Sequence, residues 1–371
     1  MTLALWRSQG AIPRDFQFVL RDVNQSCKDA FNKAGKPELA KSLRVDEEND
    51  KLAKSAWMIL ATLEKLNVVA AGFDHDYLGQ FYETFFRYTG GNTIGQYFTP
   101  RHITAFMADA CEVEPTDLVV DPACGTGGFL IACIQRVIAT LHTKYEDAAE
   151  MVRDRLIGYE SEPVTAALCV ANMILRGDGK SGVRKHDCFT AKDYPAGQCD
   201  VALMNPPFPH KRTDSKPESF VERALEALKS RGKLAVVLPT SLIVEKDKGT
   251  WRSGLLMKHS VFAVIQLPDE CFQPYASSNT SVVIFEKGIP QNDKRKTTFV
   301  RVQYDGLTLK KVSASAGQMV RISFPRRLKP SSTKSLFLDS PVRPSFQVEW
   351  SGHLEPIYHP GCQQKMNLGK V

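Results

Sequence analysis

The sequence predicts an α/β fold: a mostly parallel sheet with helices on both faces, an antiparallel strand near one edge, and a small helical domain in front. Short apolar runs alternate with segments of helical periodicity along the middle of the chain, as strands and crossover helices do in parallel sheets. Before residue 88 the apolar residues recur at helical spacing, for example at Trp57, Leu60 and Leu63. These two patterns favour one large α/β domain with a helical extension.

The expected elements follow the chain in order. Six apolar runs have the length and composition of buried strands, at residues 118–120, 156–159, 201–204, 234–238, 261–265 and 281–285. Helical patterns fill gaps between them, at residues 128–141, 163–175 and 218–229. The last two strands are joined without a helix, so an antiparallel strand is expected near one edge of the sheet.

Three parts are expected: a helical N-terminal domain at residues 1–94, a central α/β domain at 95–290, and a basic C-terminal extension at 291–371. The extension is rich in basic residues, Ser and Pro, and an Asp-Gly pair after Tyr304 predicts a hairpin before a partly irregular end. Its basic clusters are more often a solvated surface than a nucleic-acid track.

Composition sets the class of protein. The chain of 371 residues has a formal net charge of +7, which permits a polyanionic partner such as nucleic acid without requiring one. Its nine cysteines are an odd number without a close Cys-x-x-Cys pair, which is typical of reduced thiols in a cytoplasm. No apolar run approaches the roughly 20 residues of a membrane span. A soluble cytoplasmic protein with no membrane partner is expected.

The most informative segment is Asn205, Pro206, Pro207 and Phe208, directly after the apolar run at 201–204. The exocyclic amine of adenine is a poor nucleophile, because its lone pair is delocalised into the ring. The Asn205 side-chain carbonyl and the main-chain carbonyl of Pro206 can each accept one N–H and free that lone pair. Phe208 offers a flat apolar face to a base swung out of a duplex. The segment therefore predicts methylation of adenine N6.

An ordinary alternative is that a strand ends here in a turn, where Asn and Pro are common. Lys211 and Arg212 follow closely and are candidates for phosphate contacts, although a solvated loop is the more frequent role of such residues.

A glycine-rich segment from Asp121 to Gly128 follows the first expected strand, where open α/β sheets bind ligands. Gly125 and Gly127 allow close approach of the backbone to a ligand, and Cys124 and Thr126 flank Gly125. A nicotinamide dinucleotide site is the first alternative, but the spacing departs from Gly-x-Gly-x-x-Gly. The leading carboxylate of Asp121 suits a cationic methionine-type ligand better than a pyrophosphate. The loop therefore favours S-adenosylmethionine, and no metal is expected.

Further residues bear on the same ligand. Glu160 ends an expected strand, where a carboxylate can accept from both ribose hydroxyls. Asp187 follows a weaker candidate strand and is a candidate acceptor for the adenine amine of the cofactor, although an Asp in a turn is ordinary. Tyr97, Phe98 and Thr99 lie in a loop before a helical pattern, and on their own the aromatics are better explained as core.

In combination these segments resemble the N6-adenine DNA methyltransferases of the gamma order, and most closely the modification subunits of type I restriction-modification systems. Four blocks occur in the family's order: Gly-Gln-Tyr-Phe-Thr-Pro at 95–100, Asp-Pro-Ala-Cys-Gly-Thr-Gly-Gly-Phe at 121–129, Gly-Tyr-Glu at 158–160 and Asn-Pro-Pro-Phe at 205–208. Similar stretches extend the resemblance from about residue 76 to residue 306.

The resemblance implies a Rossmann-like methyltransferase domain at 95–290 that binds S-adenosylmethionine and uses residues 205–208 for catalysis. The resemblance also changes the interpretation of residues 97–99, which it implies are cofactor contacts and not core residues. With the candidates argued above, the expected cofactor-binding residues are Tyr97, Phe98, Thr99, Asp121, Cys124, Gly125, Thr126, Gly127, Glu160, Asp187 and Asn205. The activity implied is that of a site-specific, adenine-specific DNA methyltransferase.

The resemblance also implies partners: double-stranded DNA, a separate specificity subunit that reads the sequence, and a restriction subunit. Two departures are a shorter helical N-terminal part than is typical and a C-terminal region too short for two target recognition domains. Alternatives stay open at this point. They are a phage or plasmid variant or part of a longer fused enzyme, a methyltransferase acting on RNA adenine or a protein glutamine amide, and a non-catalytic scaffold subunit.

Overall fold

A parallel sheet forms the centre of the first of two units into which the chain divides, Met1–Val236 and Val237–Val371. The computed structural model describes residues 19–65, 99–143, 145–176, 182–209, 213–269, 271–272, 279–292, 294–304 and 347–349. The strands of this sheet run in the order β3-β2-β1-β4-β5, each parallel to its neighbours. Their bounds are β1 Val119–Asp121, β2 Leu156–Glu160, β3 Gly182–Lys185, β4 Cys199–Met204 and β5 Leu228–Pro239.

The order of these strands reverses between β1 and β4. The chain moves outward from β1 through β2 to β3 and then returns to the other side of β1 as β4. In the register, Val120 lies opposite Ile157 of β2 and Ala202 of β4. Ligands in open α/β sheets bind outside the carboxyl ends of strands at such a switch point. The fold therefore points to the residues that follow β1 and β4.

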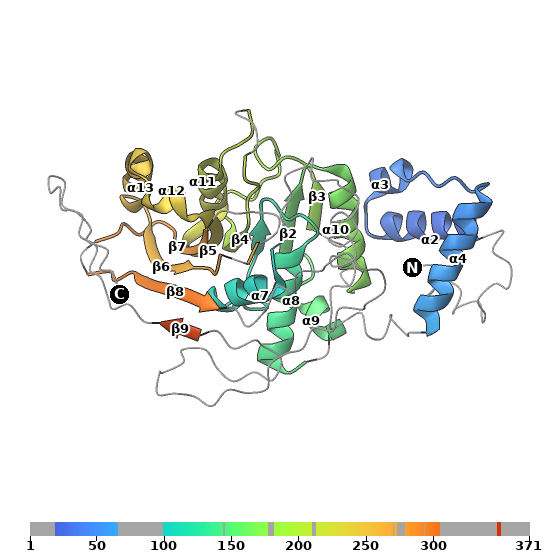
Figure 1. Ribbon diagram of the computed structural model, residues 1–371, viewed down its shortest axis with the longest axis horizontal. Helices are drawn as coiled ribbons and strands as arrows, with labels where there is room; N and C mark the ends of the chain where they lie inside the picture. Colours follow the sequence, from blue (N-terminus) through green and yellow to red (C-terminus); the bar gives the residue numbers. More distant parts are fainter. Residues whose placement is uncertain are drawn as a thin grey trace, which may run out of the picture. The chain divides into compact units, whose positions relative to one another are not determined.

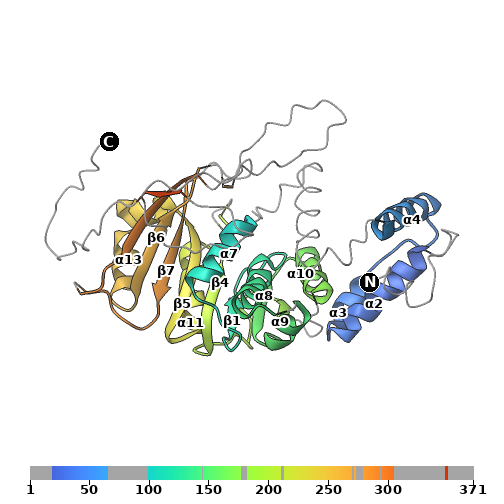
Figure 2. The ribbon, with the colours of Figure 1, turned by 90° about the horizontal axis from the view of Figure 1, so that it is seen from below.

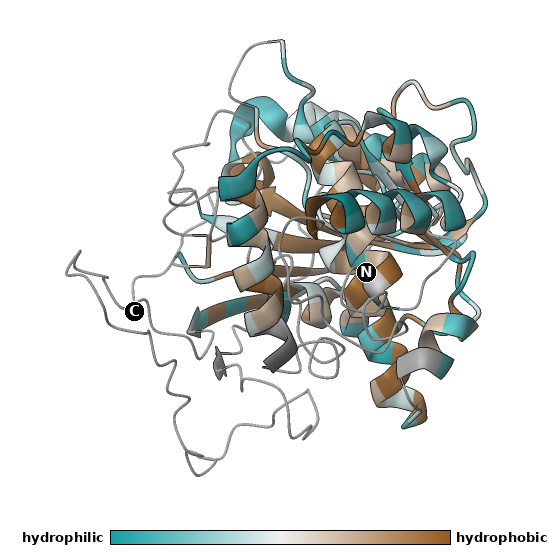
Figure 3. Ribbon diagram, turned by 90° about the vertical axis from the view of Figure 1, so that its right-hand side faces the viewer, coloured by the Kyte–Doolittle hydropathy of each residue, from teal (hydrophilic) through white to brown (hydrophobic). Residues whose placement is uncertain are grey.

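The central strands are buried along their length because helices cover both faces of the sheet. All residues of β1 and β2 are buried, as is typical of parallel strands, and Figure 3 shows the strands mostly in brown and the outer sides of helices in teal. Figure 1 shows α7 and α8 on one side of β1 and β4 and α11 on the other. The helices are α7 Arg101–Ala110, α8 Gly128–Leu141, α9 Tyr145–Met151, α10 Pro163–Leu175 and α11 Pro217–Ala227.

Three helices confirm the predicted helical character of the N-terminal part: α2 Val19–Lys33, α3 Pro37–Ser42 and α4 Asp50–Lys65. They have a small core of their own, since Val19, Leu20 and Ala53 are buried against each other. Trp57 and Leu60, two of the residues that indicated a helix, pack against this core. The helical pattern expected beyond residue 65 lies outside the described residues.

The second unit holds strands of mixed direction. As predicted, two strands are antiparallel: β6 Ser260–Gln266 and β7 Thr280–Glu286. A parallel strand, β8 Thr298–Tyr304, pairs with the other side of β6, and β9 Gln347–Glu349 is antiparallel to β8. Figure 2 shows these strands side by side. Short helices precede them: α12 Thr240–Val244, the 3-10 turn Lys246–Lys248 and α13 Gly249–Leu256.

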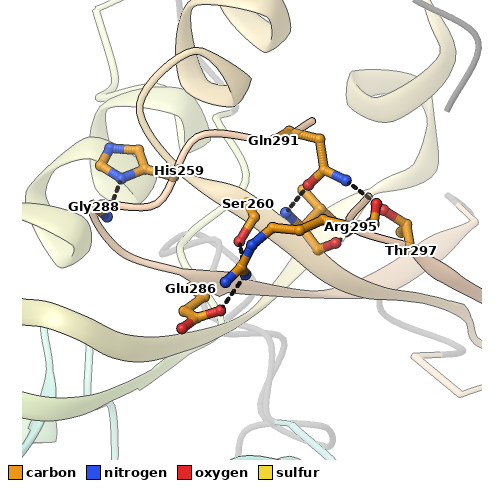
Figure 4. A network of polar contacts seen from close by, with 8 residues as sticks. His259, Ser260, Glu286, Gly288, Gln291, Arg295 and Thr297 are labelled. Carbon is orange, nitrogen blue, oxygen red and sulfur yellow. Dashed lines mark hydrogen bonds and ion pairs between the residues drawn. The ribbon is translucent and has the colours of Figure 1, made fainter. Parts of the chain in front are cut away.

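A polar network attaches the segment after β7 to the start of β6 (Figure 4). Arg295 donates to the Ser260 hydroxyl at 3.0 Å and pairs with the Glu286 carboxylate at 2.6 Å. The Gln291 side chain accepts from the N–H of Val261 at 3.0 Å and donates to the Arg295 carbonyl. These contacts set the course of the chain into β8.

Two predicted boundaries were wrong. The helix expected at 218–229 spans Pro217–Ala227, because Leu228 already pairs with Cys199 of β4 as the start of β5. The strand expected at 234–238 is correspondingly longer, and its register shifts between Cys199 and Val201 while Arg231 adopts a φ of 68°. The predicted hairpin after Tyr304 lies outside the described residues. The predicted domain limits at 94 and 290 stay predictions.

Candidate functional site

The site lies at the carboxyl ends of β1 and β4. Asp121 is the last residue of β1, and Asn205 directly follows β4. Since these strands are parallel neighbours on the two sides of the switch point, both side chains belong to one edge of the sheet. Two segments predicted from the sequence to act together are thus adjacent in the fold.

The loop after β1 has the backbone geometry that its glycines allow. Gly125 and Gly127 have φ values of 54° and 89°, in the left-handed region that side chains rarely adopt. The N–H of Cys124 donates to the carbonyl of Tyr159 at 2.9 Å, which holds the loop against β2. Apart from Gly125 and its two neighbours in the chain, no atom of the described residues lies within 4 Å of a Cβ built on Gly125. The loop therefore presents open backbone in front of helix α8.

Asp121 is fully buried and incompletely satisfied. Its Oδ1 accepts from the N–H of Ala123 at 3.0 Å, whereas its Oδ2 has no hydrogen-bond partner among the described residues. Burial raises the pKa of Asp121 to about 8, and the nearby Glu160 carboxylate adds to the rise. A buried carboxylate oxygen without a donor is costly, unless a ligand supplies one. Its position suits a cationic ligand group.

Glu160 ends β2 beside the same loop. One carboxylate oxygen accepts from the N–H of Gly125 at 3.1 Å, and the other accepts from the N–H of Glu162 at 2.8 Å. Burial raises the pKa of Glu160 as well. Each of its oxygens has a further lone pair, so the carboxylate can hold the loop and still accept from a ligand hydroxyl.

Helix α10 supports the loop from behind, which the sequence did not reveal. Asn172 is 1% exposed and donates from Nδ2 to the carbonyl of Thr126 at 3.0 Å. The guanidinium of Arg176, which is also buried, donates to the Asn172 side chain. A signal was present: Asn172 is a polar residue inside the apolar helix sequence of α10. A polar residue on a buried face needs a partner.

Small residues let the loop, β2 and α10 approach each other closely. A Cβ on Gly158 of β2 would lie 2.8 Å from Cys124 Sγ, and a Cβ on Gly127 would lie 2.9 Å from Cys169 Sγ. The two thiols are themselves 3.8 Å apart and buried. Gly158, which the sequence pointed to only as part of the Gly-Tyr-Glu block at 158–160, is thus required for packing under the loop.

Asn205 is held at its amide nitrogen and open at its amide oxygen. Its Nδ2 donates to the Thr99 hydroxyl at 3.0 Å, across 106 residues of sequence. Its Oδ1 is buried and has no hydrogen-bond partner in the described part of the chain. Pro206 is buried, Pro207 is exposed and Phe208 is partly exposed. The tetrapeptide therefore offers an unused acceptor beside a partly accessible aromatic ring.

Asp187 lies in the turn after β3 and is exposed. Its carboxylate accepts from the N–H of Phe189 at 2.9 Å, so one role of this side chain is to shape its own turn. Tyr97, Phe98, Lys211 and Arg212 lie outside the described residues. Within the described ranges, no group of three or more His, Cys, Asp or Glu residues could hold a metal ion, and no helix is long and apolar enough to cross a membrane.

This arrangement of strands and loops occurs in solved methyltransferases. The chain aligns with the methyltransferase subunit of a type I restriction-modification system from Streptococcus thermophilus with a TM-score of 0.57 and 20% sequence identity. The alignment covers 84% of this chain and 69% of that chain. At this identity the likeness shows the fold alone, and the fold class is the mostly parallel α/β fold that was predicted.

Within this class the chain belongs to the N-6 DNA methylase family, which it matches over residues 73–315. It is 33% identical over 258 residues to the type II restriction enzyme and methyltransferase RM.BcgI of Heyndrickxia coagulans, covering 67% of this chain and 40% of the relative. It is 27% identical over 260 residues to the type I restriction enzyme EcoEI methylase subunit of Escherichia coli, covering 65% and 53%. The chain thus spans about half the length of these relatives or less.

Proposed function

We propose that this protein transfers a methyl group from S-adenosylmethionine to the exocyclic N6 of an adenine in DNA. The observation that carries this proposal is the pair of buried acceptors without partners, Asp121 Oδ2 after β1 and Asn205 Oδ1 after β4. Asp121 Oδ2 suits a cationic group of a ligand, and Asn205 Oδ1 suits an amine that donates an N–H to it. Membership of the N-6 DNA methylase family supports the same assignment.

The residues around the first acceptor fit the cofactor. Asp121 would receive a positively charged group, the open backbone at Gly125 would receive the bulk of the ligand, and Glu160 would accept from ribose hydroxyls. Asp187 is proposed to contact the adenine of the cofactor, with Tyr97, Phe98 and Thr99 closing the site. When bound, S-adenosylmethionine supplies an electrophilic methyl group on a sulfonium.

The residues around the second acceptor fit the target base. Asn205 Oδ1 and the carbonyl of Pro206 would accept the two N–H groups of the adenine amine, which frees the nitrogen lone pair for in-line attack on the methyl carbon. Phe208 would stack on the extruded base. The transfer would be direct, with the remainder of the cofactor leaving as a neutral thioether, and the proton of the methylated amine would be lost to solvent.

Replacing Asn205 tests this role. Asn205→Ala is expected to lower the single-turnover rate of methyl transfer to DNA by about a hundredfold or more, since one preorganised contact to the reacting group is worth that much. Cofactor affinity, measured by calorimetry, is expected to stay within about threefold of the wild-type value. A normal rate in the variant would refute the assignment.

The substrate class needs a separate comparison. Wild-type protein is incubated with radiolabelled cofactor and equal amounts of double-stranded DNA, RNA or protein extract. Label in DNA, recovered as N6-methyladenine after digestion, supports the proposal. Label confined to RNA or to protein would favour the other substrates that an Asn-Pro-Pro-aromatic segment serves, and cofactor binding without any transfer would indicate a scaffold subunit.

We further propose that the chain acts as the modification subunit of a restriction-modification system, with sequence choice made by a specificity subunit and cleavage by a restriction subunit. The similarity to a type I methylase subunit supports this arrangement, and the similarity to a combined restriction enzyme and methyltransferase shows that the same domain occurs in a larger chain. Long-read sequencing that detects modified bases, with the gene intact and deleted, tests it. One short motif methylated only when the gene is intact is the expected result.

A further inference from the structure

The contact between Thr99 and Asn205 connects two segments that the catalytic site requires. Thr99 immediately precedes Pro100, the cap residue of helix α7, whose carbonyl accepts from the N–H groups of Ile103 and Thr104 at 2.9 and 3.1 Å. The hydroxyl of Thr99 accepts from Asn205 Nδ2 at 3.0 Å. The end of β4 is thereby bonded to the start of α7.

Helix α7 itself packs against α8, the helix that follows the loop after β1. Arg136 of α8 pairs with Asp109 of α7 at 2.8 Å and donates to the carbonyl of Val113 at 2.8 Å. A Cβ on Gly128, the first residue of α8, would lie 3.7 Å from the Thr104 methyl group. Thr99 therefore stands at the start of a helix, α7, that packs against the helix beginning at the glycine loop, α8, and this gives its hydroxyl a defined place relative to that loop.

The orientation of the Asn205 amide decides whether the site works. A carboxamide has an acceptor at one end and two donors at the other, and rotation by half a turn exchanges them. With Nδ2 on Thr99, the buried Oδ1 is the end left for a ligand. In the reverse orientation an NH₂ group would face the N–H groups of an amine, and donor would meet donor.

We infer that Thr99 is a positioning residue that holds the Asn205 amide with its oxygen toward the target amine. This inference rests on the proposed function and deepens it. The resemblance places Thr99 beside the cofactor, and the geometry adds a bond from its hydroxyl to the catalytic amide. Thr99 thus acts on the methyl transfer through Asn205, without touching the reacting atoms.

Matched substitutions separate the hydroxyl from the shape of the side chain. Thr99→Val keeps the branching and removes the acceptor, whereas Thr99→Ser keeps the acceptor. At saturating cofactor, Thr99→Val is expected to lower the single-turnover methylation rate by about tenfold, the value of one hydrogen bond. Thr99→Ser is expected to methylate DNA at a rate within about threefold of the wild-type value. Titration of each variant with cofactor separates this effect from any change in cofactor affinity.

A second background tests the orientation argument itself. Asn205→Asp replaces the amide by a carboxylate whose two oxygens are both acceptors, so no orientation can be lost. Adding Thr99→Val to Asn205→Asp is expected to change the remaining rate by less than about threefold. An equal loss in both backgrounds would show that Thr99 does not act through the amide, and would overturn the inference.

The positioning can also be measured without activity. In protein labelled with ¹⁵N at asparagine, the side-chain NH₂ signals of Asn205 are those absent from Asn205→Asp. Thr99→Val is expected to shift these signals, and Thr99→Ser is expected to leave them near their wild-type positions. Unshifted signals in Thr99→Val, or a full methylation rate, would overturn the inference. If the wild-type protein methylates no DNA, the proposed function fails, while the amide signals still report the bond.

Discussion

At the scale of single residues, the site consists of acceptors that the protein leaves unused. Asp121 is buried, one of its oxygens has no donor in the described structure, and its pKa is raised to about 8. Near neutral pH the carboxyl group therefore holds a proton when no cofactor is bound. A cationic ligand favours the ionised form, so binding must release this proton.

Cofactor binding is accordingly expected to depend on pH through Asp121. As the pH rises from 6 toward 8, the dissociation constant of S-adenosylmethionine should fall by about tenfold per unit, and it should level off above 8. Asp121→Asn should bind weakly and without this dependence. Calorimetry in buffers of different ionisation enthalpy measures both affinity and the proton released.

A matched control uses Asp147, an exposed carboxylate on α9. Asp147→Asn should retain the wild-type pH dependence. An affinity for cofactor that is constant between pH 6 and 8 in the wild-type protein would contradict the role of Asp121 as the titrating group.

At the scale of elements, helix α10 holds the glycine-rich loop after β1, the proposed cofactor site, in place through Asn172. Asn172→Leu keeps the size of the side chain but removes its donor, which leaves the carbonyl of Thr126 without that bond and Arg176 without its amide partner. The loss of one buried hydrogen bond corresponds to roughly a tenfold weaker cofactor affinity. Calorimetry measures this, and the methylation rate at saturating cofactor should change much less.

Val164 offers a control on the same helix, because its side chain is 55% exposed. Val164→Ala should leave cofactor affinity unchanged. If Asn172→Leu lowered the methylation rate at saturating cofactor and left the cofactor affinity unchanged, α10 would affect the methyl-transfer step and not cofactor binding by the loop.

How far the elements could be predicted depended on which forces set their ends. Helices α8 and α10 have the predicted bounds, because Gly127 and Pro163 are local signals of a helix start. The end of α11 was missed, since Leu228 continues the apolar spacing of the helix and is drawn into β5 by pairing with Cys199. Pairing between distant strands overrides local periodicity, and no local pattern reports it.

The candidate site shows the same division. Asp121, Glu160 and Asn205 could be found because each ends or directly follows a strand, and strand ends converge at the switch point. The bond between Thr99 and Asn205 and the bond between Asn172 and Thr126 join segments 106 and 46 residues apart. Both need the folded backbone to bring their atoms together, so spacing along the chain could not reveal them.

At the scale of the whole molecule, the buried acids of the site affect stability. Asp121 has a pKa of about 8 when folded and 3.8 as its ordinary value, and the pKa of Glu160 is raised in the same direction. Between pH 3.8 and about 8, Asp121 holds a proton in the folded protein and has released it in the unfolded chain. Stability without cofactor therefore falls as the pH rises through this window, and the fall ends above the folded pKa.

His259 acts in the opposite sense near neutral pH and affects the range in which to measure. Burial lowers the pKa of His259 below 6.5, and its Nδ1 accepts from the N–H of Gly288 at 3.0 Å. The contribution of His259 is thus present above pH 6.5 and lost as the pH falls. The effect of His259 fades as the pH rises from 6.5 toward 8, where the unfolded chain also holds it neutral, and there the acids of the site can be observed.

Urea unfolding without cofactor, between pH 6.5 and 8, measures this dependence of stability on pH. The free energy of unfolding of the wild-type protein should fall with rising pH by up to about 1.4 kcal/mol per unit, the value for one proton. Asp121→Asn should remove most of this slope and should be the more stable form at pH 8. Saturating cofactor should also remove the slope from the wild-type protein, because Asp121 is then ionised in the folded state. Equal slopes in the wild type and in Asp121→Asn would show that another group titrates. The protonation of Asp121 would then not be the cause of the pH dependence of stability.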